Sequence, residues 1–172
     1  MLHEKGYTNL TGGDLEDYLD EEVRAFASCK PIDFNTEPLP WGDRSFDAVI
    51  SWEVMEHLEN PFHFVREIAR VLKPGGLFLF STPNIQHLTN KIQFLRTGDM
   101  PRWRARNDHI ALFPKGVFGK VFLRQFSIVE KGFVRGEFQY KIFNLFRWPE
   151  NELFGNTVYY VLRRNEAGLS SD

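Results

Sequence analysis

The sequence has one cysteine, almost no net charge and no hydrophobic run long enough to span a membrane. With only Cys29, the 172-residue chain forms no intrachain disulfide and no cysteine cluster for a metal ion, which fits a reducing compartment. A formal net charge of −2 gives no overall basic field for nucleic acid or an anionic membrane. No apolar run approaches the ~18 residues of a spanning helix, and the first residues lack a signal-peptide core. These absences favour a cytoplasmic protein with neither nucleic acid nor a membrane as partner.

What the sequence does contain is the pattern of one α/β domain over residues 1–172. Asn60 and Pro61 supply an N-cap and a first-turn proline, and a broad apolar face follows them. "LKPGG" then ends this predicted helix and turns the chain. The apolar runs Phe46–Ser51 and Leu77–Ser81 lie on either side and read as buried strands. Strand, helix, turn and strand make a βαβ unit, so the predicted fold is a mostly parallel sheet.

Further elements are predicted on weaker patterns, before and after this unit. We expect a short strand at 8–12, a helix from Leu15, a very short strand at 32–34, a helix near 114–123, and strands at 126–134 and 156–164. The two late strands predict a closing antiparallel hairpin. Residues 82–112 are less regular and are a possible substrate-recognition insert.

One stretch carries a family resemblance. "LPWGDRSFDAVISWEVMEHLENPFHFVREIARVLKPGGLFLFSTPN" resembles the middle of class I S-adenosylmethionine (SAM)-dependent methyltransferases, especially the type-11 or UbiE-like small-molecule group. The matching pieces are the approach into the family's fourth strand, the "EVMEHLENP" after it, and "LKPGG" before the fifth strand. The resemblance implies a Rossmann-like sheet and methyl transfer from SAM to a small-molecule acceptor.

The first residues of the sequence do not resemble the beginning of that fold but a part that comes later in it. "LHEKGYTNLTGGDLE" resembles the end of the family's first helix and its second strand. The first strand, which lies between the second and fourth, and its glycine-rich loop would precede Met1. Three alternatives stay open: a truncated start, a degenerate relative, or a chain completed by a partner or second copy over the open sheet edge. The rival function is accordingly a non-catalytic remnant that binds a partner through this edge.

The resemblance implies SAM as cofactor and assigns it six residues, which follow three of the strands: Asp14, Asp33, Phe34, Ser51, Trp52 and Glu53. Asp14 matches the acid that accepts hydrogen bonds from ribose hydroxyls, and Asp33 with Phe34 matches the adenine contacts. The other three match the methionine and methyl-transfer pocket. Plainer alternatives remain, because Asp14 suits a helix N-cap, Asp33 a surface turn and Trp52 the core.

A histidine follows the fourth strand of the family and is the candidate catalytic residue. His57 has an unperturbed pKa near neutrality and suits a general base, although a structural role in its loop is the alternative. If a helix began at Glu53, Glu53 and His57 would share one face of it. Glu56 adds a further acid, but a Glu–His pair without a third ligand does not make a metal site, so no metal is predicted.

Acceptor binding is expected from residues after the fifth strand of the family. Polar and aromatic side chains gather there: Asn84, His87, Arg96, Arg102, Trp103, Arg104, Arg106 and His109. We single out Arg102, Trp103, Arg104 and His109 as substrate-binding candidates, because arginines beside a tryptophan suit a carboxylate or phosphate. A solvated loop is the alternative. Aromatic residues at 138, 140, 143, 146 and 154 form either core packing or an apolar lid.

Overall fold

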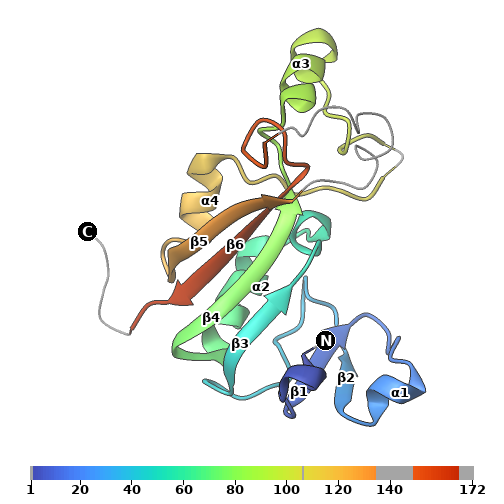
Figure 1. The fold of residues 1–172 in the computed structure, drawn as a ribbon, viewed down its shortest axis with the longest axis vertical. Coiled ribbons are helices and arrows are strands. Elements are labelled where there is room, and N and C mark those ends of the chain that lie inside the picture. Colours follow the sequence, from blue (N-terminus) through green and yellow to red (C-terminus); the bar gives the residue numbers. More distant parts are fainter. Residues whose placement is uncertain (1, 106, 135–148, 167–172) are drawn as a thin grey trace.

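The computed structural model describes residues 2–105, 107–134 and 149–166, and its strands form two separate sheets (Figure 1). The larger sheet has four strands in the order β3-β4-β6-β5. Their bounds are Phe46–Ser51 for β3, Leu72–Pro83 for β4, Phe126–Val134 for β5 and Thr157–Arg164 for β6. β3 and β4 are parallel, whereas β6 is antiparallel to both β4 and β5. The predicted α/β class and the closing antiparallel hairpin are confirmed.

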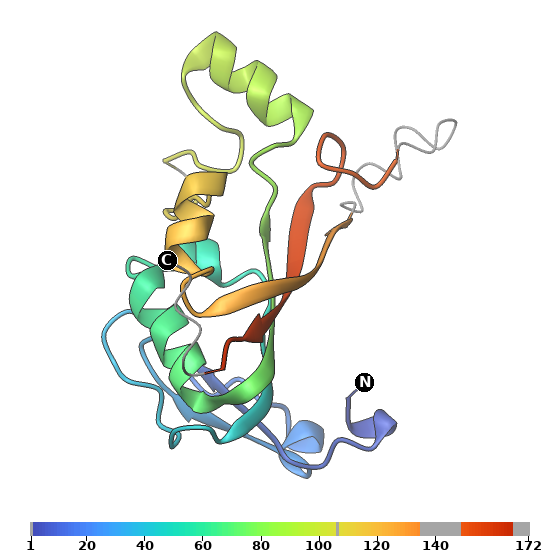
Figure 2. The same ribbon diagram turned by 90° about the vertical axis from the view of Figure 1, so that its left-hand side faces the viewer.

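Helices α2 (Pro61–Val71) and α4 (Lys115–Val121) pack on one face of this sheet (Figure 2). The core lies between them and the central strand β4, where Phe78 and Phe80 have no exposed surface. The Phe80 ring stacks on Phe122 at a centroid distance of 4.6 Å and on Tyr160 at 5.2 Å. Burying such rings stabilises the fold by roughly 2–3 kcal/mol each. This half of the molecule therefore has a continuous aromatic core.

The smaller sheet pairs β1 (Leu10–Asp14) with β2 (Ala27–Pro31) in parallel. Among the described residues β1 pairs with no strand of the larger sheet. A cavity of about 240 Å³ lies between β1 and β3, and we call it the apolar trough. Its lining includes Leu10, Gly13, Trp41, Val49, Ile50 and Phe64. The trough lies where the resemblance places the family's first strand.

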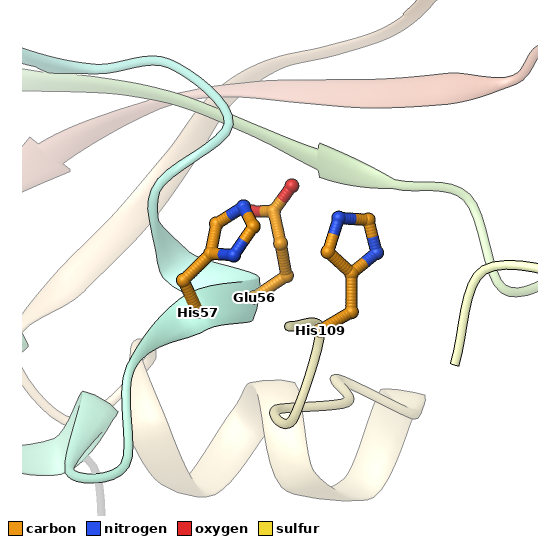
Figure 3. A group of neighbouring side chains, drawn as sticks. All are labelled: Glu56, His57 and His109. Carbon is orange, nitrogen blue, oxygen red and sulfur yellow. The ribbon is translucent and has the colours of Figure 1, made fainter. Parts of the chain in front are cut away.

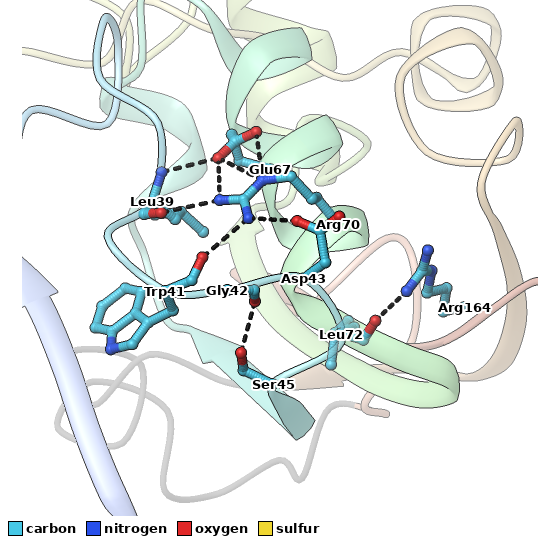
Figure 4. A network of polar contacts seen from close by, with 9 residues as sticks. All are labelled: Leu39, Trp41, Gly42, Asp43, Ser45, Glu67, Arg70, Leu72 and Arg164. Atoms are coloured by element: carbon cyan, nitrogen blue, oxygen red, sulfur yellow. Dashed lines mark hydrogen bonds and ion pairs between the residues drawn. The ribbon is translucent and has the colours of Figure 1, made fainter.

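The connection between the two sheets is held by one arginine of α2 (Figure 4). Arg70 donates to the carbonyl oxygens of Leu39 and Trp41, each at 2.9 Å, and to the carboxylate of Asp43 at 2.8 Å. Glu67 completes the network, because it accepts from Arg70 at 2.7 Å and from the Leu39 amide at 2.8 Å. The Arg70 guanidinium lowers the pKa of the Glu67 carboxyl. Residues 39–43 are thereby fixed to the larger sheet's helix.

The predicted start of α2 is confirmed. The side chain of Asn60 accepts a hydrogen bond from the His63 amide at 3.1 Å, and Pro61 is the first helical residue. The capping oxygen satisfies one of the orphan amides of the first turn.

The helix predicted from Leu15 is wrong. Only a short α1 (Glu21–Arg24) forms, while the Leu15 and Tyr18 side chains are 67% and 70% exposed. Asp14 is the last residue of β1 and accepts from the Leu15 amide at 2.7 Å, so it does not cap a helix. Helical spacing alone does not stabilise a short helix when no surface covers its apolar residues.

Two other expectations are corrected. The strand expected at 32–34 lies earlier, at β2, and residues 32–34 form the loop that follows it. Residues 82–112 include a ten-residue helix, α3 (Leu88–Thr97), which has only Asn90 buried. A helix that buries so little shows almost no apolar periodicity in the sequence. Two 3₁₀ turns, η1 (His3–Lys5) and η2 (Met55–His57), complete the elements.

None of the helices in the described part of the chain is both long and apolar enough to cross a membrane. The aromatic positions 138, 140, 143 and 146 lie outside the described residues.

Candidate functional site

The carboxyl ends of β1, β2 and β3 meet at one edge of the molecule. Asp14 ends β1 opposite Pro31 of β2, and its carbonyl accepts from the Ile32 amide at 2.7 Å. The loop after β2 reaches the loop after β3, because Asn35 Oδ1 accepts from the Glu59 amide at 2.8 Å. Open α/β sheets bind their ligands at such an edge.

Three of the predicted cofactor residues lie at this edge: Asp14 at the end of β1, and Asp33 and Phe34 in the loop after β2. Asp14 is exposed. The Asp33 carboxylate accepts from the Asn35 amide and the Thr36 hydroxyl, each at 2.9 Å, and these bonds lower its pKa. Phe34 packs on Phe64 with ring centroids 5.0 Å apart. Asp33 therefore already stabilises its own turn, whereas Asp14 presents an exposed carboxylate.

The end of β3 has an unusual backbone. Glu53 has a φ of 52°, a left-handed conformation that is costly for a residue other than glycine. Ser81 of β4 holds it there, since its Oγ accepts from the Glu53 amide at 2.9 Å and donates to the Glu53 carboxylate at 3.0 Å. Glu53 lies outside η2, so the helical face that it was predicted to share with His57 does not form. Two strands thus fix one carboxylate at the edge.

The two residues before Glu53 differ in burial. Trp52 is 54% exposed, so its alternative placement in the core is wrong. Ser51 is buried, and its Oγ has no hydrogen-bond partner among the described residues. Trp52 is therefore available as a wall for a ligand at the edge.

Beyond Glu53 three side chains converge (Figure 3): Glu56 and His57 from η2, and His109 from the segment before α4. One ligand atom from each lies within 4.8 Å of the others. The backbone explains their approach, because the Glu56 carbonyl accepts from the amides of Ile110 and Ala111 at 2.8 and 2.9 Å. We call these three residues the Glu–His cluster.

Burial changes the proton affinity of this cluster. Glu56 has no exposed surface, and desolvation raises the pKa of its carboxyl to about 7, with the nearby Glu53 charge adding to the effect. Neither carboxylate oxygen of Glu56 has a hydrogen-bond partner among the described residues. Desolvation, His57 and Arg102 lower the pKa of His109, so its neutral imidazole is favoured. His57 Nδ1 lies 3.1 Å from the Asp108 carboxylate, although the pair is not aligned as a hydrogen bond.

The predicted acceptor residues divide between this cluster and the loop around it. Arg102 lies 3.8 Å from the Glu53 carboxylate. Trp103 donates from its indole to the Ala111 carbonyl at 3.1 Å, and its ring is 5.6 Å from that of His109. Arg104 belongs to the same loop, where its carbonyl accepts from the Asn107 amide. Arg106 lies outside the described residues.

A cavity of about 270 Å³ opens beside Trp103, past the end of β4, and we call it the β4 pocket. Its walls are mainly apolar, with Phe113, Phe118 and Tyr160 among them. Lys115 and Lys131 also line it and lie 3.8 and 3.7 Å from the carboxylate of Glu152, a third charged residue of the lining. Asn84 closes one side, because its side-chain amide donates to the carbonyls of Glu152 and Gly155 at 2.8 Å. Asn84 thus positions a loop, and His87 caps α3 through the Thr89 amide.

The sequence reasoning missed Ser81, and it named His109 only as an acceptor-binding candidate and not as a neighbour of Glu56 and His57. Glu56 and His57 stand together in "EVMEHL", but His109 comes 52 positions after His57. In the "NDHIALF" segment the only signal for His109 is a histidine next to apolar residues. This pattern is common in sequences that have no functional site.

The fold and the edge define a class I SAM-dependent methyltransferase architecture. A solved SAM-dependent methyltransferase from Mesorhizobium loti superposes with a TM-score of 0.63 at 20% identity, covering 94% of this chain and 83% of that one.

The sequence comparisons agree with the fold. Residues 1–80 match the model of a family described as a methyltransferase domain. A probable SAM-dependent methyltransferase from Mycolicibacterium smegmatis is 52% identical over 50 residues, which is 29% of this chain. A ubiquinone biosynthesis O-methyltransferase from Ruegeria pomeroyi is 34% identical over 90 residues, which is 51% of this chain. The matches span 20% and 36% of the length of these two relatives. The resemblance that the residues suggested is therefore confirmed for the fold, and the sequence similarity to methyltransferases lies within the matched segments.

Proposed function

We propose that the protein is a SAM-dependent methyltransferase that acts on a small-molecule acceptor. The observation that carries this proposal is the common edge where Asp14 ends β1, the Asp33 loop follows β2 and Glu53 follows β3. The names of the sequence relatives support the same cofactor and reaction.

In this proposal Asp14 binds the ribose hydroxyls and Asp33 with Phe34 the adenine. Ser51, Trp52 and Glu53 line the methionine end. The exposure of Asp14 and Trp52 fits such contacts, since both are available at the edge. The bound sulfonium supplies an already activated methyl group, so the chain's own residues have to align the acceptor and exclude water.

The β4 pocket is our candidate for the acceptor. Its apolar walls, with two lysines that share the single carboxylate of Glu152, suit a small molecule with an apolar body and one anionic or polar group. Arg102, Trp103 and Arg104 belong to the loop beside the pocket, and His109 belongs to the Glu–His cluster itself. His57 is the proposed general base for a hydroxyl acceptor in the metal-free protein, with Asp108 beside its Nδ1.

Calorimetric titration of the chain with SAM and S-adenosylhomocysteine tests the proposal. We expect micromolar binding that weakens at least about 10-fold in Asp14→Asn, because the amide loses the charge that strengthens a hydroxyl hydrogen bond. Asp47→Asn is the matched control: this carboxylate of β3 is 86% exposed and forms an ion pair with Lys73. Absence of binding at millimolar ligand in a folded chain, or equal weakening in both variants, would contradict the proposal.

The apolar trough favours one second candidate, a partner-binding module. Val49 and Ile50 of β3 face Leu10 of β1 across it, and no described strand pairs with these edges. We propose as occupant an extended apolar strand from a second copy of the chain, because backbone groups on both sides are available to pair. Sedimentation should then give a concentration-dependent dimer that Val49→Asp abolishes. A monomer at all concentrations contradicts this candidate.

We also propose a cytoplasmic location, supported by the use of a single, unpaired Cys29.

A further inference from the structure

The Glu–His cluster contains buried polar atoms that form no hydrogen bonds with the described residues. Four of its buried atoms have no hydrogen-bond partner among the described residues: both carboxylate oxygens of Glu56, Nδ1 of His109, and Nδ1 of His57, which lies 3.1 Å from the Asp108 carboxylate without forming an aligned hydrogen bond. An unpaired buried polar group costs about 1–3 kcal/mol, and a charged one costs more. Such a concentration of buried polar atoms without hydrogen bonds in one place requires an explanation.

We propose that Glu56, His57 and His109 bind a divalent transition-metal ion of the Zn²⁺ type. The donor set is one carboxylate oxygen and two imidazole nitrogens, which suits Zn²⁺ and its neighbours in the transition series. Mg²⁺ and Ca²⁺ fit poorly, because they prefer oxygen ligands. A cation would pair the buried carboxylate and the buried ring nitrogens together.

The geometry is close to that of a bound site. Ligand atoms that share one Zn²⁺ at about 2.1 Å lie roughly 3.4 Å apart, whereas those of the cluster lie within 4.8 Å. Side-chain rotation closes a difference of this size. The anchoring of Ile110 and Ala111 on the Glu56 carbonyl fixes the backbone on both sides of the cluster.

The charges around the cluster favour a cation on balance. Glu53 acts on both Glu56 and His109, and Asp108 lies 3.1 Å from His57. Arg102 opposes them, but it lies 3.8 Å from Glu53, which offsets its charge.

The inference goes beyond the proposed methyl transfer and does not depend on it. Trp103 contacts His109 and also lines the β4 pocket, so the ion would lie next to the proposed acceptor. A Lewis acid in that position lowers the pKa of a hydroxyl that binds to it. With the ion bound, His57 is a ligand and no longer a general base.

Metal titration of the chelator-treated full chain tests the site. We expect one Zn²⁺ per chain by calorimetry, and Co²⁺ in its place should give the visible absorption of a protein-bound ion with imidazole ligands. His109→Ala and Glu56→Gln should each weaken Zn²⁺ binding by at least about 10-fold, since even residues that only support a ligand contribute 10–100-fold. SAM titration of the same samples separates failure of this site from failure of the proposed function.

Two controls keep the result interpretable. His3→Ala removes an exposed histidine that stacks on Phe26 and should leave Zn²⁺ affinity unchanged. Glu56→Gln removes the buried charge at nearly constant shape, and a cooperative urea-unfolding transition in this variant shows that loss of binding does not come from unfolding. Absence of Zn²⁺ binding in the folded chain, or equal affinity in the wild type and His109→Ala, overturns the inference.

Discussion

The two sheets of this protein differ in how completely they are covered. The larger sheet buries a continuous aromatic core beneath α2 and α4, with Phe78, Phe80, Phe122 and Phe126 at 1% exposure or less. The smaller sheet has one short helix, α1, and the described residues 2–45 contribute only Ile32 and Leu39 to the buried core. Stability therefore resides in one half, while the other half supplies exposed groups at the candidate cofactor edge.

The largest expected effect is on the well-packed half. Phe80→Ala should lower the free energy of unfolding by about 3–5 kcal/mol, because it leaves a cavity among stacked rings. Urea unfolding measures this change. Phe94→Ala is the matched control, since Phe94 is 50% exposed on α3 and should change stability by about 0.5 kcal/mol or less.

If Phe80→Ala does not fold, Phe80→Leu provides a milder test of the same core. Equal effects at positions 80 and 94 would show that the aromatic core is not what distinguishes the two halves.

The next effect concerns the unpaired carboxylate at the edge of the packed half. Glu56 has a folded-state pKa of about 7, above its usual 4.5, so the folded protein binds more protons than the unfolded chain between these values. Stability should therefore fall as pH rises from about 4.5 to 7 and then level off. Glu56→Gln should remove this slope and stabilise the metal-free protein at pH 8 by up to about 3 kcal/mol.

The lowered pKa of His109 acts in the opposite direction, since it adds stability as pH rises toward 6.5. Comparing urea unfolding of Glu56→Gln with the wild type at each pH isolates the carboxylate. Glu59→Gln, at an exposed position, is the control. An unchanged pH profile in Glu56→Gln would contradict the burial argument.

A smaller effect is expected at the connection between the halves. Arg70→Ala removes charge-assisted hydrogen bonds to the Leu39 and Trp41 carbonyls, and we expect a loss of about 2 kcal/mol. Hydrogen exchange should accelerate at the Leu39 amide more than in β4. Arg70→Lys should recover little, because an ammonium does not reproduce the planar fork. Uniform acceleration across both sheets would show that the halves unfold as one unit.

The smallest effect is expected at an exposed ion pair within the packed half. Lys73 and Asp47 lie 2.7 Å apart, but their side chains are 48% and 86% exposed. Lys73→Ala should cost about 0.5 kcal/mol or less, and added salt should remove the difference. A loss comparable to that of Arg70→Ala would mean that charge pairing, and not burial, stabilises this half.

Predictions from the sequence were also more accurate for the half that contains the larger sheet than for the half that contains the smaller one. Asn60, Pro61 and the apolar run Phe46–Ser51 predicted α2 and β3 correctly, because caps and buried runs are local signals that packing here reinforces. In the smaller half, the helix expected from Leu15 did not form, since its apolar residues find no surface to cover them. The site residues of the edge remain predictions, and their placement at the ends of strands is compatible with them.

The sequence by itself determined the α/β class, the βαβ unit around "LKPGG" and the resemblance to methyltransferases. All of these depend on residues that are close together along the chain. Only the tertiary structure decided that His109 meets Glu56 and His57, that Ser81 holds Glu53 in a left-handed conformation, and that β1 and β3 leave a trough between them. Contacts between distant segments depend on how the helices and strands pack together. The local propensities of the residues do not determine that packing.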